Sequence, residues 1–255
     1  MYAYRIGREH GQYLDLIWSF IQLGLLEMPG PFADEGRTSL NSVLLNAIDA
    51  SISELGGYPD FVFLFIGGSE QHRLGLLNDP VPFDVVLPAE EELPISPNAI
   101  VLPYFQVKRL LLSYSDMKLC LVATLGDFFR CPVFQRQAPP PIESESHIRS
   151  YPGPAFQQLI AERGISPPSL RYKLWCIHSR NYEEVCKRKQ INYLTVPPGT
   201  TCGGFLNPEY IGNDSIHANL AYGHALIKDM LRQIELLSVN VPPTSFQTAS
   251  AGEIG

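Results

Sequence analysis

The sequence lacks the features that mark disulfide-rich, membrane-spanning and nucleic-acid-binding proteins. Its five cysteines are widely spread and show no paired metal-binding spacing, which is typical of reduced thiols rather than of a disulfide framework. No apolar run approaches the roughly 18 to 20 residues that a membrane span needs. The 19 Lys and Arg residues are outnumbered by 26 Asp and Glu residues, and no basic cluster is interleaved with aromatics. We therefore expect neither nucleic acid nor an anionic membrane as a partner.

The N-terminus, MYAYRIGREHGQYLDLIW, carries charges throughout its first fifteen residues and has no apolar core followed by a cleavage site. This is not the pattern of a signal peptide, and together with the reduced cysteines it predicts a cytoplasmic protein. The 255 residues are 45% hydrophobic, which is enough for one large domain with a proper core. We expect that domain over residues 1–237, followed by a Pro-, Ser- and Gly-rich tail, 238–255, whose composition is typical of disorder.

Short apolar runs rich in β-forming residues alternate along the chain with helical patterns. Strands are predicted at 17–23, 61–66, 131–137 and 191–196, and helices at 40–55, 103–113 or beyond, 155–163, 168–189 and 218–237. The run Phe61–Ile66 (FVFLFI) has no polar alternation, so both of its faces must be covered, as in a parallel sheet between helix layers. The alternation predicts a three-layer, doubly wound α/β fold with a mostly parallel sheet. The Pro- and acid-rich segment 78–97 is interpreted as an excursion from this pattern.

Polar residues follow several of the predicted strands. In a doubly wound sheet the ligand site lies beyond the carboxyl ends of the strands, where the sequence places Gly67–Ser69, Pro139–Pro141, and the pair Asp214 and His217. The pair stands at the entrance of the last predicted helix. There Asp214 could orient the imidazole as a general base. In the alternative interpretation, Asn213 or Asp214 caps the helix and His217 is a surface residue in its first turn.

Two segments resemble blocks of the SGNH/GDSL-type hydrolases. GNDSIHANLAYG (212–223) resembles the last block of that family, where an Asp-x-x-His pair precedes the final helix and supplies two members of a Ser-His-Asp triad. FVFLFIGGSEQHRLGLL (61–77) resembles the block with a Gly-Asn oxyanion pair after a central strand. The stretches QAPPPIES, RYKLWCIHSRNYEEVC and GFLNPEYIGNDSIHAN are similar to a bacterial, mostly uncharacterised branch of SGNH-like proteins. The resemblance covers about residues 15–237.

The resemblance implies a serine hydrolase that acts on a small ester or an acylated carbohydrate and needs no cofactor and no metal. In that assignment Asp214 orients His217, His217 is the base, and Gly68 with Ser69 holds the oxyanion. Ser69 stands where the family has asparagine, and because a hydroxyl reaches less far than a carboxamide we expect a weaker oxyanion hole. Ser69 also ends a strand, as nucleophiles in α/β enzymes do, but it lacks the flanking pattern of a nucleophile elbow. The resemblance leaves the oligomeric state open.

The nucleophile is the part of the family pattern that the sequence does not show. The family's serine follows the first strand in a Gly-x-Ser pattern, and none occurs before the strand predicted at 17–23. The nearest match, Gly7-Arg8-Glu9-His10, has Glu9 at the serine position and leaves no room for a crossover helix before the next strand. We therefore expect that the chain starts after the nucleophile and lacks the central first strand of a flavodoxin-like order. Met1–Ile6, closure of the neighbouring strands, or a partner chain would then fill the gap.

Three classes of function stay open at this point. The first is an SGNH-type ester hydrolase, which would be inactive if the nucleophile is absent. The second is a non-catalytic ligand-binding protein that keeps the SGNH cleft. The third and least favoured is a metal-assisted phosphoesterase using Asp214, His217 and His72.

Other conspicuous side chains are assigned to the surface or to packing. His72, His147 and His178 have no mutual spacing typical of a metal site, and surface positions are predicted for them. Core, rim or helix-surface positions are predicted for four further residues: Tyr172, Trp175, Asn219 and Tyr222.

Overall fold

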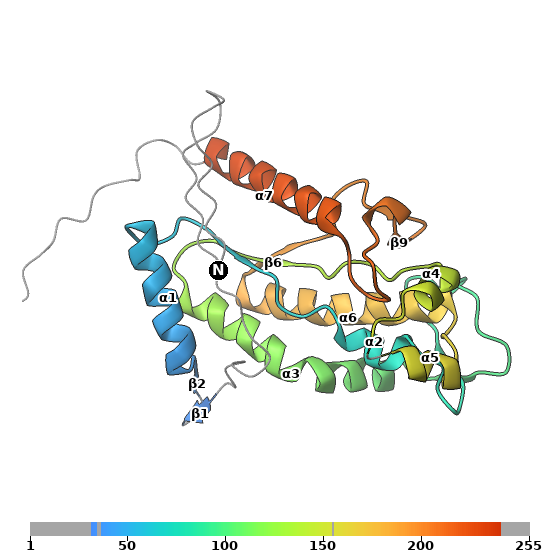
Figure 1. The fold of residues 1–255 in the computed structure, drawn as a ribbon. Coiled ribbons are helices and arrows are strands. Elements are labelled where there is room, and N and C mark those ends of the chain that lie inside the picture. Colours follow the sequence, from blue (N-terminus) through green and yellow to red (C-terminus); the bar gives the residue numbers. More distant parts are fainter. Residues whose placement is uncertain (1–31, 35–36, 155, 241–255) are drawn as a thin grey trace, which may run out of the picture.

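The computed structural model describes residues 32–34, 37–154 and 156–240, and these form an α/β fold (Figure 1). Its helices are α1 (Ser42–Leu55), α2 (Glu70–Gly75), α3 (Tyr104–Phe128), α4 (Glu145–Ser150), α5 (Gln157–Arg163), α6 (Pro168–Lys189) and α7 (Leu220–Asn240), with a 3-10 turn at Pro208–Tyr210. Its strands are β1 (Phe32–Asp34), β2 (Arg37–Ser39), β3 (Val62–Leu64), β4 (Phe83–Val85), β5 (Ile100–Leu102), β6 (Val133–Arg136), β7 (Asn192–Leu194), β8 (Thr201–Cys202) and β9 (Phe205–Leu206).

A three-stranded parallel sheet of order β3-β6-β7 lies at the centre of the described residues. Phe63 of β3 stacks on Phe134 of β6, with ring centroids 4.8 Å apart. Helices α3 and α6 lie on one side of the sheet and α7 lies on the other (Figure 1), where Arg136 of β6 forms an ion pair with Asp229 of α7 at 2.8 Å. The predicted α/β class, with a parallel sheet between helix layers, is confirmed. The strand predicted at 17–23 lies outside the described residues.

Helix α6 has the bounds predicted from its apolar spacing. Its apolar residues Leu170, Leu174, Ile177, Tyr182 and Val185 are between 0% and 6% exposed, as expected for one buried face. Their burial removes apolar surface from water, which contributes about 1.5–3 kcal/mol for each large side chain. Tyr182 and Val185 pack in one core cluster with Leu64 of β3 and Val133 of β6. Helix α6 therefore contributes to the core on its side of the sheet.

The helix predicted at 103–113 or beyond is present as α3, which continues to Phe128. Other elements differ from the sequence-based prediction. The segment 78–97 contains strand β4, which pairs in parallel with β5, and its Asp84 forms a fully buried ion pair with Lys173 of α6 at 2.8 Å. Strand β4 was missed because three residues are too few to show a period of two. Helices α2 and α4 were also missed, because six residues each are too few to show the helical period.

Helix α7 begins at Leu220 and is capped by Asn219, whose Oδ1 accepts a hydrogen bond from the N–H of Tyr222 at 3.2 Å. The cap at Asn213 or Asp214 that the alternative interpretation offered is therefore wrong. Tyr222 is 2% exposed, as predicted for a packing residue. The helix runs to Asn240, past residue 237 where it was expected to end and the tail to follow, and residues 241–255 lie outside the described part.

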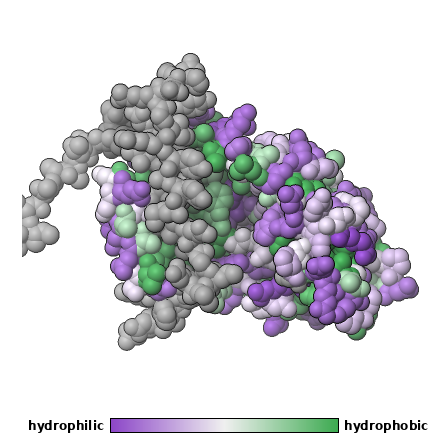
Figure 2. Space-filling view, in the orientation of Figure 1, coloured by the Kyte–Doolittle hydropathy of each residue, from purple (hydrophilic) through white to green (hydrophobic). Residues whose placement is uncertain are grey.

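The surface seen in the orientation of Figure 1 is a mosaic of hydrophilic and hydrophobic side chains (Figure 2). No helix in the described ranges combines the length and apolar character needed to cross a bilayer. All five cysteines are free thiols, in agreement with the sequence-based expectation.

Candidate functional site

Asp214 and His217 form a hydrogen-bonded pair in the loop before α7. The Nδ1 atom of His217 lies 2.6 Å from Oδ2 of Asp214, while Oδ1 accepts from the backbone N–H of Ile216 at 2.9 Å and of His217 at 2.7 Å. Burial alone would raise the pKa of Asp214, but these hydrogen bonds outweigh it and hold the pKa below its ordinary value. An ionised carboxylate can only accept a hydrogen, so it places the hydrogen of the neutral ring on Nδ1. Nε2 is then left as the basic nitrogen.

The loop that carries this pair is fastened by two further side chains. Nε2 of His147, on α4, lies 3.1 Å from the carbonyl oxygen of Gly212 and 3.2 Å from that of Asp214. Because carbonyl oxygens only accept, this nitrogen of His147 carries its hydrogen. The hydroxyl of Ser215 donates to the carbonyl of Pro152 at 2.5 Å. His147 is half-buried, and its hydrogen bonds hold the loop in place. The prediction of a surface position did not include this role.

The turn Gly67–Ser69 follows β3, as the sequence predicts. Gly67 has φ +88°, a conformation that side chains rarely adopt, and a Cβ there would collide with the ring of Tyr182 on α6. The close approach of α6 therefore requires glycine at this position, and this requirement is independent of any functional role of the turn.

The backbone N–H groups of Gly68 and Ser69 both donate to Oε2 of Glu70, at 2.9 Å and 3.1 Å. Glu70 is buried, its Oε2 lies 3.0 Å from Nε2 of His178, and its Oε1 forms an ion pair with Lys118. Burial would raise the pKa of Glu70, but the bonds from His178, Lys118 and Gly68 hold it well below its ordinary range. The predicted oxyanion donors thus have an internal carboxylate as acceptor. Glu70 was not predicted as a site residue, because its only signal in the sequence is its position directly after the predicted turn.

His72 lies on α2 and is 8% exposed. Its pKa is lowered to about 4, first by burial and then by neighbouring basic groups, of which His178 has the largest effect. The predicted surface positions of His72 and His178 are wrong, since α2 packs against α6 and both side chains are buried between them.

The structure also places Ser69 and Trp175, two residues considered in the sequence-based prediction. Ser69 is exposed, and its side chain makes no capping hydrogen bond to α2. Trp175 is 8% exposed and donates from Nε1 to the carbonyl of Ala138 at 3.1 Å, so it packs as predicted. Within the described ranges, no group of three or more His, Cys, Asp or Glu side chains is placed to hold a metal ion.

No protein-family model and no curated protein matches the sequence. Among solved structures, a GDSL-like lipase from Bacteroides thetaiotaomicron VPI-5482 is similar, with 14% sequence identity and a TM-score of 0.34 over 74% of this chain and 69% of the lipase chain.

Proposed function

We propose that this protein is an SGNH-type ester hydrolase in which His217 is the general base and Asp214 orients it, with the nucleophile left unassigned. The observation that carries the proposal is the 2.6 Å contact between Nδ1 of His217 and Oδ2 of Asp214 in a fastened loop. A serine hydroxyl is a weak nucleophile and must give its proton to an imidazole as it attacks. The carboxylate holds the required tautomer and stabilises the imidazolium that forms. The side chain of His217 is 70% exposed, so a substrate can reach it from solvent.

The oxyanion would be held by the backbone N–H groups of Gly68 and Ser69. Each N–H has a single hydrogen, and both hydrogens are donated to Glu70, so the carboxylate must withdraw before these groups can bind a substrate oxygen. One such donor is worth a factor of about 10² to 10³ in rate at other acyl-transfer sites. A small ester or an acylated carbohydrate is the substrate class that we propose.

The test is ester cleavage by the full chain and its variants, with p-nitrophenyl acetate as substrate. We expect His217→Ala and Asp214→Asn to lose a factor of about 10² or more in kcat/KM. Free imidazole also cleaves activated esters, so the matched control is His224→Ala, which removes an exposed histidine of α7. Equal rates for His217→Ala and His224→Ala would refute the proposal.

A fluorophosphonate probe tests the covalent step separately. Stoichiometric labelling that His217→Ala abolishes and His224→Ala leaves intact would support a serine hydrolase. Mapping the labelled peptide would identify the nucleophile.

A non-catalytic ligand-binding protein is the second candidate. The observation that favours it is the anchoring of Glu70, which is buried between Lys118 and His178 while it accepts the Gly68 and Ser69 N–H groups. A folded sample that neither reacts with the fluorophosphonate nor cleaves the ester would select this candidate over the hydrolase.

A further inference from the structure

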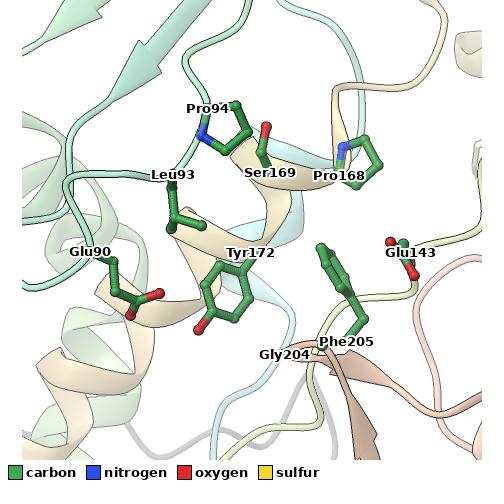
Figure 3. A pocket seen from close by; sticks show the side chains of 10 residues that line it. Glu90, Leu93, Pro94, Glu143, Pro168, Ser169, Tyr172, Gly204 and Phe205 are labelled. Atoms are coloured by element: carbon green, nitrogen blue, oxygen red, sulfur yellow. The ribbon is translucent and has the colours of Figure 1, made fainter.

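A pocket of about 360 Å³ lies between the segment before β5, the first turn of α6 and the hairpin of β8 and β9 (Figure 3). Its aromatic part consists of Tyr172 and Phe205, whose ring centroids are 5.7 Å apart at an interplanar angle of 47°. Leu93 and Pro94 supply an apolar wall. None of the residues of the proposed hydrolase site lines this pocket.

Two carboxylates flank the aromatic pair. Glu90 and Glu143 lie on opposite sides of the two rings (Figure 3). Neither forms an ion pair with a Lys, Arg or His side chain in the part of the chain that the structure describes. Arg171 acts electrostatically on Glu143, but its guanidinium donates hydrogen bonds to backbone carbonyls, and Arg180 acts electrostatically on Glu90. The pocket thus places two acids beside the two aromatic rings, and Glu90 also shares a hydrogen bond with the hydroxyl of Tyr172.

The frame of the pocket is rigid. Lys173, the neighbour of Tyr172, forms its buried ion pair with Asp84 and also donates to the carbonyl of Pro94 at 2.9 Å. On the other side, Gly204 has φ +86° and lies so close to the Tyr172 ring that a Cβ would collide with it. A preformed site needs little ordering when a ligand binds.

We propose that this pocket binds a small organic cation, an ammonium group that carries apolar substituents. The faces of aromatic rings attract cations, and carboxylates on both sides neutralise the charge. The wall of Leu93 and Pro94 suits methyl or methylene groups, and the volume is within the range of small-ligand pockets, roughly 300–1,000 Å³. The proposal does not depend on the hydrolase activity.

The experiment compares choline with 3,3-dimethylbutan-1-ol, its neutral carbon isostere, by isothermal titration of the full chain at physiological ionic strength. We expect saturable binding of choline and binding of the isostere that is at least about tenfold weaker, because only choline carries the charge. Glu90→Gln and Phe205→Leu should each weaken choline binding about threefold or more. The control Glu92→Gln, an exposed acid of the same segment that does not line the pocket, should bind as the parent does.

His217→Ala should leave choline binding unchanged, so failure of the hydrolase proposal and failure of this one are distinguishable. Circular dichroism establishes that each variant is folded. Equal affinity for choline and its isostere, preference for a neutral sugar such as glucose, or a dissociation constant for choline above about 10 mM would each overturn the proposal. The proposal would also be overturned if Glu90→Gln and Phe205→Leu bind choline as tightly as Glu92→Gln does.

Discussion

The carboxylate of Glu70 accepts a hydrogen bond from the backbone N–H of Gly68 at 2.9 Å and lies 3.0 Å from Nε2 of His178. One buried acid thus joins the turn after β3 to helix α6. It also occupies the N–H group that we propose as an oxyanion donor, so Glu70 links the stability of the fold to the state of the site.

Glu70→Gln should destabilise the protein by about 3 kcal/mol at pH 7, because it leaves Lys118 and His178 without their buried anion. The pKa of Glu70 is lowered on folding from its ordinary value of 4.5, so its stabilising contribution is present above about pH 4.5 and is lost as the pH falls through the folded pKa. Urea denaturation at pH 7 and in acid measures both effects. The parent should lose stability in acid more steeply than Glu70→Gln. Glu92→Gln is the control, and equal acid sensitivity of the parent and Glu70→Gln would contradict the prediction.

Lys173→Met should cost about 3–5 kcal/mol, because it leaves the carboxylate of Asp84 buried without a counter-charge. The double variant with Asp84→Asn should recover part of that loss, since it removes the unpaired charge as well. Urea denaturation of the single and double variants measures the recovery. A double variant less stable than Lys173→Met would show that the ion pair is not the source of the effect.

Gly67→Ala should destabilise by about 2–4 kcal/mol, the sum of a strained positive φ and a collision with Tyr182. The matched control is Gly153→Ala, where φ is +70° but nothing lies within 4 Å of the added Cβ. That variant should lose only about 1 kcal/mol. Thermal or urea unfolding separates the two contributions, and equal losses would mean that the contact with Tyr182 is unimportant.

His147→Ala should lower the rate of ester cleavage about 10- to 100-fold, because it frees the loop that positions His217. His147→Gln keeps an N–H donor for the two carbonyls and should retain much of the rate. Kinetics with p-nitrophenyl acetate and the NMR signal of the His217 Nδ1–H proton report the effect. If the signal and the rate survive in His147→Ala, the loop does not need this anchor.

The positions of α6 and β3 were predicted from local patterns of residues. The spacing of Leu170, Leu174 and Ile177 predicts a helix with one buried face, and the run FVFLFI predicts the position of a strand. The expectation that both faces of this strand are covered is not met at Phe65, which is 52% exposed. Both patterns lie within single elements, so they can be read without knowing the partners. The same pattern reading missed β4, α2 and α4, which are too short to show a period.

The sequence by itself placed Asp214 and His217 within reach of each other in one loop, but it left open whether Asp214 orients the imidazole or caps the helix. The structure shows the contact between them. Only the tertiary structure decided that the N–H groups of Gly68 and Ser69 face Glu70, since that acid is held by His178, 108 residues along the chain. Tertiary packing likewise buried His72 and His178. Contacts between distant segments depend on how helices pack on the sheet, and no local pattern of residues encodes that packing.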